Sequence, residues 1–208
     1  MRRLHALVGL AAITMSISCG DVIRQGRSPV YLVVDRLQGI RGGPGGGTGS
    51  GTLLSDVITN VTSPDPCTPA RPCPTIFDDP GQVQLRVAPK DVTTAGTTLA
   101  PTSNSDVTIT RYHVVYRRAD GRNSQGTDVP YAFDGAITGT VPVGSSIGFG
   151  FVLVRHAAKE ESPLVQLTTS PTIITTIADV TFYGHDQVGN DISVMGSIQI
   201  DFGNFGDQ

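Results

Sequence analysis

Apolar and polar side chains alternate residue by residue through much of this chain, which is the pattern of β-strands with one buried face. The clearest run is 192–202, where every second residue except Gly196 is apolar. The other strands that this pattern predicts are 30–35, 53–60, 82–87, 108–118, 131–141, 149–154 and 173–185. Because 149–154 is apolar on both faces, we expect it to be a central strand that is covered on both sides.

Glycine, proline and hydroxyl-rich stretches separate these strands and predict long loops near 38–52, 62–81 and 92–105. Within the first loop, the glycine-rich run 42–51 lacks the Gly-Lys-Ser/Thr ending of a phosphate-binding loop. We therefore interpret this run as a flexible surface excursion. Only 155–161 has a helical pattern, and Pro163 would end it. Many short strands with such turns predict an all-β fold, an antiparallel sandwich.

Two segments resemble known β-sandwich modules. The run 109–121, with Tyr112, Val114 and Tyr116 on alternate positions, resembles the third strand of a fibronectin type III domain. The run 180–190 resembles the closing hairpin of fibronectin type III and bacterial Ig-like modules. The resemblance implies an Ig-like/fibronectin type III-like sandwich over 30–208, with longer loops than a module of about 100 residues has. It implies no activity.

The N-terminus has the three parts of a secretory signal: Arg2 and Arg3, a mostly apolar run at 4–17, and small residues before Cys19. The apolar run is shorter than the about 20 residues that a membrane span needs. Its end resembles a bacterial lipobox, although Ser16 stands where an aliphatic residue is usual. The resemblance implies removal of a signal peptide at 1–18, lipidation of Cys19 and a tether at 19–29. The alternative is an ordinary signal peptide that is cut nearby.

The three cysteines fit the same interpretation. An odd number is unusual in an exported protein, but Cys67 and Cys73 lie close together in a proline-rich loop and can form a disulfide. Cys19 then remains for lipid. A zinc site at Cys67 and Cys73 would need further Cys or His ligands, and none cluster there.

Two further groups of residues are candidates for chemistry. Ser146 lies in a Gly-x-Ser-x-Gly sequence, and Asp179 and His185 follow in the order of a hydrolase triad. That motif requires a strand before it and a helix after it, whereas the next segment here has a strand pattern, so we predict a turn and no catalytic residues. Near the C-terminus, Asp186, Asn190 and Asp191 could hold Ca²⁺, or could be ordinary turn residues.

The net charge of −3 gives no electrostatic basis for binding nucleic acid. We therefore expect a non-enzymatic binding or structural module of the bacterial cell envelope, anchored by lipid at the periplasmic face or the cell surface. It would have no cofactor and no metal, and its loops would contact a protein or glycan ligand. The alternatives are a subunit that polymerises into an envelope assembly and, on Ser146 alone, a serine hydrolase.

Overall fold

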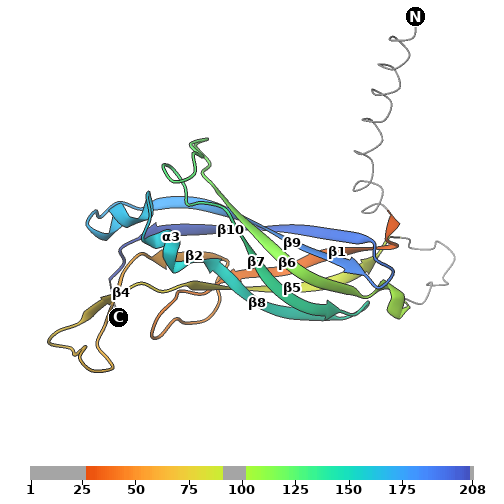
Figure 1. Cartoon of the computed structure of the whole chain (residues 1–208), viewed down its shortest axis with the longest axis horizontal. Helices are drawn as coiled ribbons and strands as arrows, with labels where there is room; N and C mark the ends of the chain where they lie inside the picture. Colours follow the sequence, from red (N-terminus) through yellow and green to blue (C-terminus); the bar gives the residue numbers. More distant parts are fainter. Residues whose placement is uncertain (1–26, 91–101, 207–208) are drawn as a thin grey trace, which may run out of the picture.

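The computed structural model describes residues 27–90 and 102–206, which form two facing β-sheets and a two-stranded ribbon (Figure 1). The small sheet has the order β1 (Val30–Gly39), β5 (Asp79–Pro89), β8 (Ser146–Val154). The large sheet has the order β2 (Thr52–Asp56), β10 (Asp191–Gly203), β9 (Ile174–Asp186), β6 (Val107–Arg117), β7 (Phe133–Val141). The ribbon pairs β3 (Thr59–Val61) with β4 (Cys73–Thr75).

Helical structure is limited to short turns in the described residues: α3 (His156–Lys159) and the 3₁₀ turns η1 (Ser103–Ser105) and η2 (Leu164–Thr168). The all-β prediction is therefore confirmed, and α3 lies inside the segment that was expected to be helical. The antiparallel expectation holds for every strand pair of the two sheets except one, because β2 pairs with β10 in parallel. The strands β2 and β10 are far apart in the chain, so no tight hairpin turn fixes their relative direction and parallel pairing is possible.

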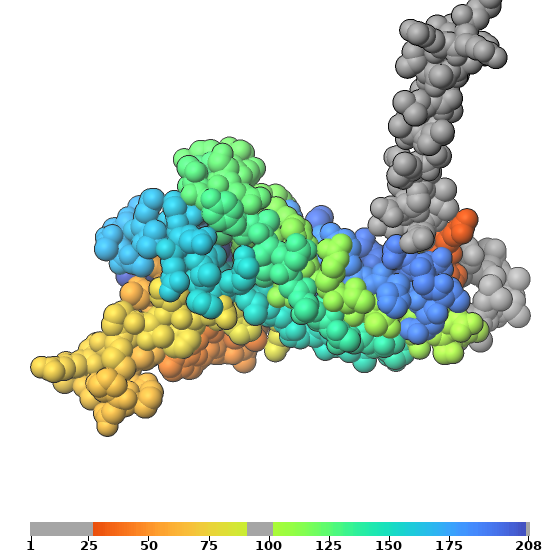
Figure 2. Space-filling view, in the orientation of Figure 1, coloured from red at the N-terminus to blue at the C-terminus, as the bar shows by residue number. Residues whose placement is uncertain are grey.

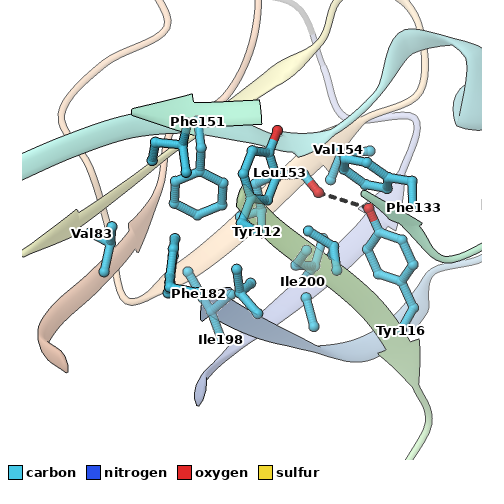
Figure 3. Close-up of a cluster of buried hydrophobic side chains, with 14 of the residues drawn as sticks. Val83, Tyr112, Tyr116, Phe133, Phe151, Leu153, Val154, Phe182, Ile198 and Ile200 are labelled. Atoms are coloured by element: carbon cyan, nitrogen blue, oxygen red, sulfur yellow. Dashed lines mark hydrogen bonds between the residues drawn. The ribbon is translucent and has the colours of Figure 1, made fainter. Parts of the chain in front are cut away.

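Alternating side chains of both sheets meet in one core cluster. In β10 the predicted inward set is buried or half-buried, and Ser193, Met195, Ser197 and Gln199 between them are exposed. Near the centre, the ring of Phe151 packs edge-on against Tyr112 and Phe182, with centroid distances of 5.1 and 5.4 Å (Figure 3). This packing of aromatic edges against faces adds to the burial of apolar area between the sheets.

A buried hydrogen bond also joins the two sheets. The hydroxyl of Tyr116 in β6 donates to the backbone carbonyl of Leu153 in β8 at 2.7 Å (Figure 3). Burial raises the pKa of Tyr116, with the Asp79 carboxyl adding to the effect, so the phenol keeps its proton. The bond therefore satisfies a polar group that would otherwise be unpaired between the sheets.

The prediction that 149–154 is a central strand is wrong. The strand β8 lies at the edge of the small sheet, next to β5 alone. Its apolar residues lie in two different environments. Phe151 and Leu153 are buried in the core, and Phe149 packs beside β7. A Cβ at Gly139 of β7 would lie 2.3 Å from the Phe149 ring, so only glycine fits at that position.

The long strand β10 runs from one end of the sandwich to the other (Figure 1). At one end, a turn at 187–190 joins β9 to β10, and we call this the hairpin end. At the other end, β10 finishes beside β2 with Gly203 opposite Asp56. The segment 59–75, which we call the arm, projects from the body at this second end, the arm end (Figure 2).

Several sequence-based predictions lie outside the described residues: the signal peptide 1–18, the lipidation site Cys19 and most of the tether and of the loop 92–105. The expected start of the sandwich at residue 30 coincides with the first residue of β1. In the described part of the chain, no helix is long and apolar enough to span a membrane.

Candidate binding cleft at the arm end

The arm is held together by backbone pairing and by a disulfide. Thr59 pairs with Thr75 and Val61 pairs with Cys73 across the β3–β4 ribbon. The structure joins Cys67 to Cys73 with an S–S distance of 2.01 Å, as the sequence predicts. The bond closes a loop of a few residues, so it restrains the tip of the arm locally and does not link the two sheets.

A second loop, residues 40–50, lies beside the arm, and we call it the glycine loop. Its base is closed by two backbone hydrogen bonds between Gly39 and Ser50, of 2.9 and 3.0 Å. Gly43 and Gly45 have φ of 101° and 78°, which glycine adopts without strain. At Gly42 a Cβ would lie 2.1 Å from the Asp78 carbonyl oxygen. The loop expected as a surface excursion is thus packed against the start of β5, and this packing requires glycine.

A cleft of about 350 Å³ lies between the arm and the glycine loop. One wall is formed by Arg41 and the glycine backbone, and the other by residues 59–63, which carry hydroxyl and amide groups. The Arg41 guanidinium donates to the Asp56 carboxylate at 2.5 Å, and the Asp56 side chain is 1% exposed. This ion pair fixes the position of the Arg41 guanidinium. The cleft therefore offers many hydrogen-bonding groups and one anchored cation to a polar ligand.

A buried charged cluster lies next to the glycine loop. Lys159 Nζ in α3 contacts Asp79 Oδ2 at 2.9 Å, and both side chains are 1% exposed. The Ser55 hydroxyl donates to the same carboxylate oxygen at 2.6 Å. The Gly42 amide donates to the other oxygen at 2.8 Å. Lys159 also donates to the Asp56 backbone carbonyl at 2.8 Å.

The electrostatics of this cluster are dominated by burial. Removal from water raises the pKa of Asp79 above its ordinary value, although Lys159, Ser55 and the Gly42 amide act in the opposite direction. Sequence reasoning missed the cluster, because Lys159 lies in the short polar stretch Lys-Glu-Glu, which is typical of an exposed turn. The one available signal was the scarcity of lysine, since the chain has only Lys90 and Lys159.

The structure does not bring together Ser146, Asp179 and His185. Ser146 lies in the small sheet, where its hydroxyl contacts Asp35 at 3.1 Å. Asp179 lies in the large sheet and accepts hydrogen bonds from Arg117 and Ser197, each at 2.5 Å. His185 is six residues along the same strand, β9, which corresponds to about 20 Å. The hydrolase interpretation therefore has no geometric support.

The carboxylate of Asp186 caps the turn at the hairpin end. It accepts hydrogen bonds from the Val188 amide at 3.1 Å and from the Asn190 amide and side chain, both at 2.8 Å. Burial opposes ionisation, but these bonds and one from Ser28 together hold the pKa of Asp186 below its ordinary value. These hydrogen bonds are those expected if Asp186 is an ordinary turn residue and not a Ca²⁺ ligand. Across the two described ranges, no three His, Cys, Asp or Glu side chains are grouped to hold a metal ion.

Comparisons of the chain with family models, with curated proteins and with solved structures found no match.

Proposed function

We propose that this protein is a lipid-anchored, exported β-sandwich module that binds a polar ligand of the bacterial envelope at its arm end and has no enzymatic activity. The observation that carries the proposal is the cleft between the disulfide-restrained arm and the glycine loop. Two restrained loops that face each other across a polar cleft lose little conformational entropy on binding.

The strand order supports an Ig-like/fibronectin type III-like module. In such domains strands A, B and E form one sheet and C, F and G the other. Here the first, fifth and eighth strands make the small sheet, and the sixth, ninth and tenth are neighbours in the large one. Sandwiches of this kind carry their binding loops at the ends of the sheets, and the cleft is at such an end.

The direction in which the chain enters the sandwich also favours binding at the arm end. Ser28 hydrogen-bonds to Asp186 at the hairpin end, and β1 starts there at Val30. A lipid on Cys19 would therefore hold the hairpin end close to the membrane. The arm end would point away from the bilayer, towards ligands in the envelope (Figure 1).

The anchor is tested by fractionating cells that express the full chain. Wild-type protein is expected in the membrane fraction, with a diacylglyceryl group on a mature N-terminal Cys19 by mass spectrometry. A Cys19→Ser variant is expected to move to the soluble fraction. An unmodified mature N-terminus at any other residue would contradict lipid anchoring.

Binding is tested by co-sedimentation with purified peptidoglycan sacculi, whose sugar hydroxyls and peptide carboxylates match the groups of the cleft. Wild-type protein is expected to sediment with the sacculi. Thr62→Trp, which places a bulky ring in the cleft, should reduce retention at least tenfold. Thr138→Trp adds the same ring at an exposed position of β7 and should leave retention unchanged. Absence of wild-type retention, or equal loss in both variants, would overturn the proposal.

A polymerising subunit remains the second candidate, and the free edge of β7 favours it. Among the residues that the structure describes, this strand pairs with β6 on one side only, and Asp134 is the single charged residue among its nine. Long edge strands with few charges are templates for pairing with another chain. Light scattering distinguishes the candidates, because a strict monomer at high concentration excludes the assembly role.

A further inference from the structure

We propose that Lys159 and Asp79 condense after folding to form an intramolecular amide cross-link, with loss of one water molecule. The proposal concerns the buried cluster and not the cleft, so it stands independently of the proposed function. It assigns the cluster the role of a self-modification site that joins the start of β5 to α3.

The amine of Lys159 and the carboxyl of Asp79 are close together and shielded from solvent. Lys159 Nζ and Asp79 Oδ2 are 2.9 Å apart, and each side chain is 1% exposed. Amines and carboxylic acids do not condense in water, where both are ionised and hydrated. Burial penalises the charged form of the Asp79 carboxyl, which favours the neutral acid that condensation requires. The raised pKa of Asp79 is consistent with this. A fixed geometry further supplies a large effective concentration.

The two carboxylate oxygens of Asp79 have different partners. Oδ1 accepts a hydrogen bond from the Gly42 amide at 2.8 Å. This oxygen would stay in the product as the carbonyl oxygen of the amide. Oδ2 contacts both the Lys159 amine at 2.9 Å and the Ser55 hydroxyl at 2.6 Å, so it is the oxygen that can receive protons and leave. Backbone amides that donate to the developing oxyanion lower the barrier of acyl transfer.

The step balances without a further reactant. The Lys159 ammonium transfers one proton to Asp79 Oδ2, which gives an amine and a carboxylic acid. The amine nitrogen then attacks Cγ, and the negative charge that develops on Oδ1 is stabilised by the Gly42 amide. The Cγ–Oδ2 bond breaks, and Oδ2 takes a second proton from the nitrogen, relayed by the Ser55 hydroxyl. Water leaves, and an amide with one N–H remains.

Two contacts from the fold hold the Lys159 amine in place. Its second hydrogen bond, to the Asp56 carbonyl at 2.8 Å, orients Nζ towards Asp79. Of the two lysines in the chain, Lys90 is exposed and Lys159 is fully buried. An unreactive ion pair at this position would be costly, since desolvation of both charges offsets most of their attraction.

The sequence makes the test simple. A lysine-specific endoproteinase can cut this chain only after Lys90 and Lys159, because no other lysine is present. Purified full-length protein is incubated under native conditions, denatured, reduced and digested. If the amide has formed, the fragment 160–208 is not released, and the fragments on either side of Lys90 remain joined. The mass of the joined product should be one water lower than the sum of its parts.

Two variants serve as controls. Lys159→Arg keeps the charge but cannot be cut at that position, so it should give 91–208 unjoined to the N-terminal fragment. Ser55→Ala should retain the fold and form the cross-link at least tenfold more slowly. Release of unmodified 160–208 in full from wild-type protein would overturn the proposal, as would joining in the Lys159→Arg variant.

Discussion

Two aspartates lie fully buried at opposite ends of this sandwich, and their surroundings shift their pKa values in opposite directions. At the hairpin end, Asp186 receives hydrogen bonds from amides of its own turn, and its pKa is lowered. At the arm end, Asp79 faces Lys159 and Ser55, which come from distant parts of the chain, and its pKa is raised. Burial opposes ionisation at both sites; at Asp79 it outweighs the Lys159 charge and the hydrogen bonds, whereas at Asp186 the hydrogen bonds outweigh it.

This difference separates a structural carboxylate from a candidate reactive one. Asp186 is ionised and its oxygens are occupied by the amides that shape the turn, so it is inert. One oxygen of Asp79 contacts an amine and a hydroxyl in a site that is shielded from solvent, so it has a partner with which it can react. The same residue type therefore serves as a turn cap at one end and as a modification site at the other.

The largest expected effect comes from removing the amine. Lys159→Met would leave Asp79 buried without its partner and should lower the free energy of unfolding in urea by about 3–5 kcal/mol. The double variant with Asp79→Asn should recover the part of this loss that comes from the uncompensated buried charge, but not the part that comes from the missing cross-link. Lys90→Met, at an exposed lysine, should change stability by less than about 0.5 kcal/mol. Equal effects of the two lysine substitutions would contradict the special role of Lys159.

A smaller effect is expected at the hairpin end. Asp186→Ala removes the acceptor for the Val188 and Asn190 amides and should cost about 1–3 kcal/mol in the same assay. Asp191→Ala, in the next strand and exposed, is the matched control and should be nearly neutral. If Asp186→Ala were also neutral, the turn would not depend on its cap, and Ca²⁺ coordination by this group would deserve a direct titration.

The smallest effect is a pH dependence. Because the pKa of Asp186 is lowered on folding, its contribution is present above the ordinary carboxyl pKa of 3.8 and is lost as the pH falls through the folded value. The stability difference between wild type and Asp186→Asn should therefore shrink below about pH 4. Urea unfolding at pH 3, 5 and 7 measures this, and a difference that grows with acidity would reverse the assigned sign.

Local patterns in the sequence were enough for most strands. The alternation of apolar and polar residues predicted the positions of β1, β5, β6 and β10 correctly, because each of these strands has one face in the core and one outside. It failed for β8, since Phe149 is apolar for a reason that alternation does not encode, namely contact with Gly139 in the neighbouring sheet. It also joined β2 and β3 into one strand, although these two strands belong to different sheets.

The site was only partly predictable. The Cys67–Cys73 disulfide follows from two cysteines in one loop, and the turn at Asp186 follows from local residue types. The Asp79–Lys159 pair depends on contacts between segments that are far apart in the chain and carries no local motif. A single buried lysine has the same sequence signature as an exposed one, so only the fold could reveal it.

A carbon-detected NMR titration of the aspartate carboxyls tests the contrast most directly, with Asp79→Asn and Asp186→Asn variants to assign the two signals. The account predicts that the Asp186 carboxyl titrates below 3.8 while the Asp79 signal stays at the position of an amide carbonyl over the whole acid range. An Asp79 carboxyl that titrates at any pH would contradict the cross-link, and one that titrates together with Asp186 would also contradict the difference between the two sites.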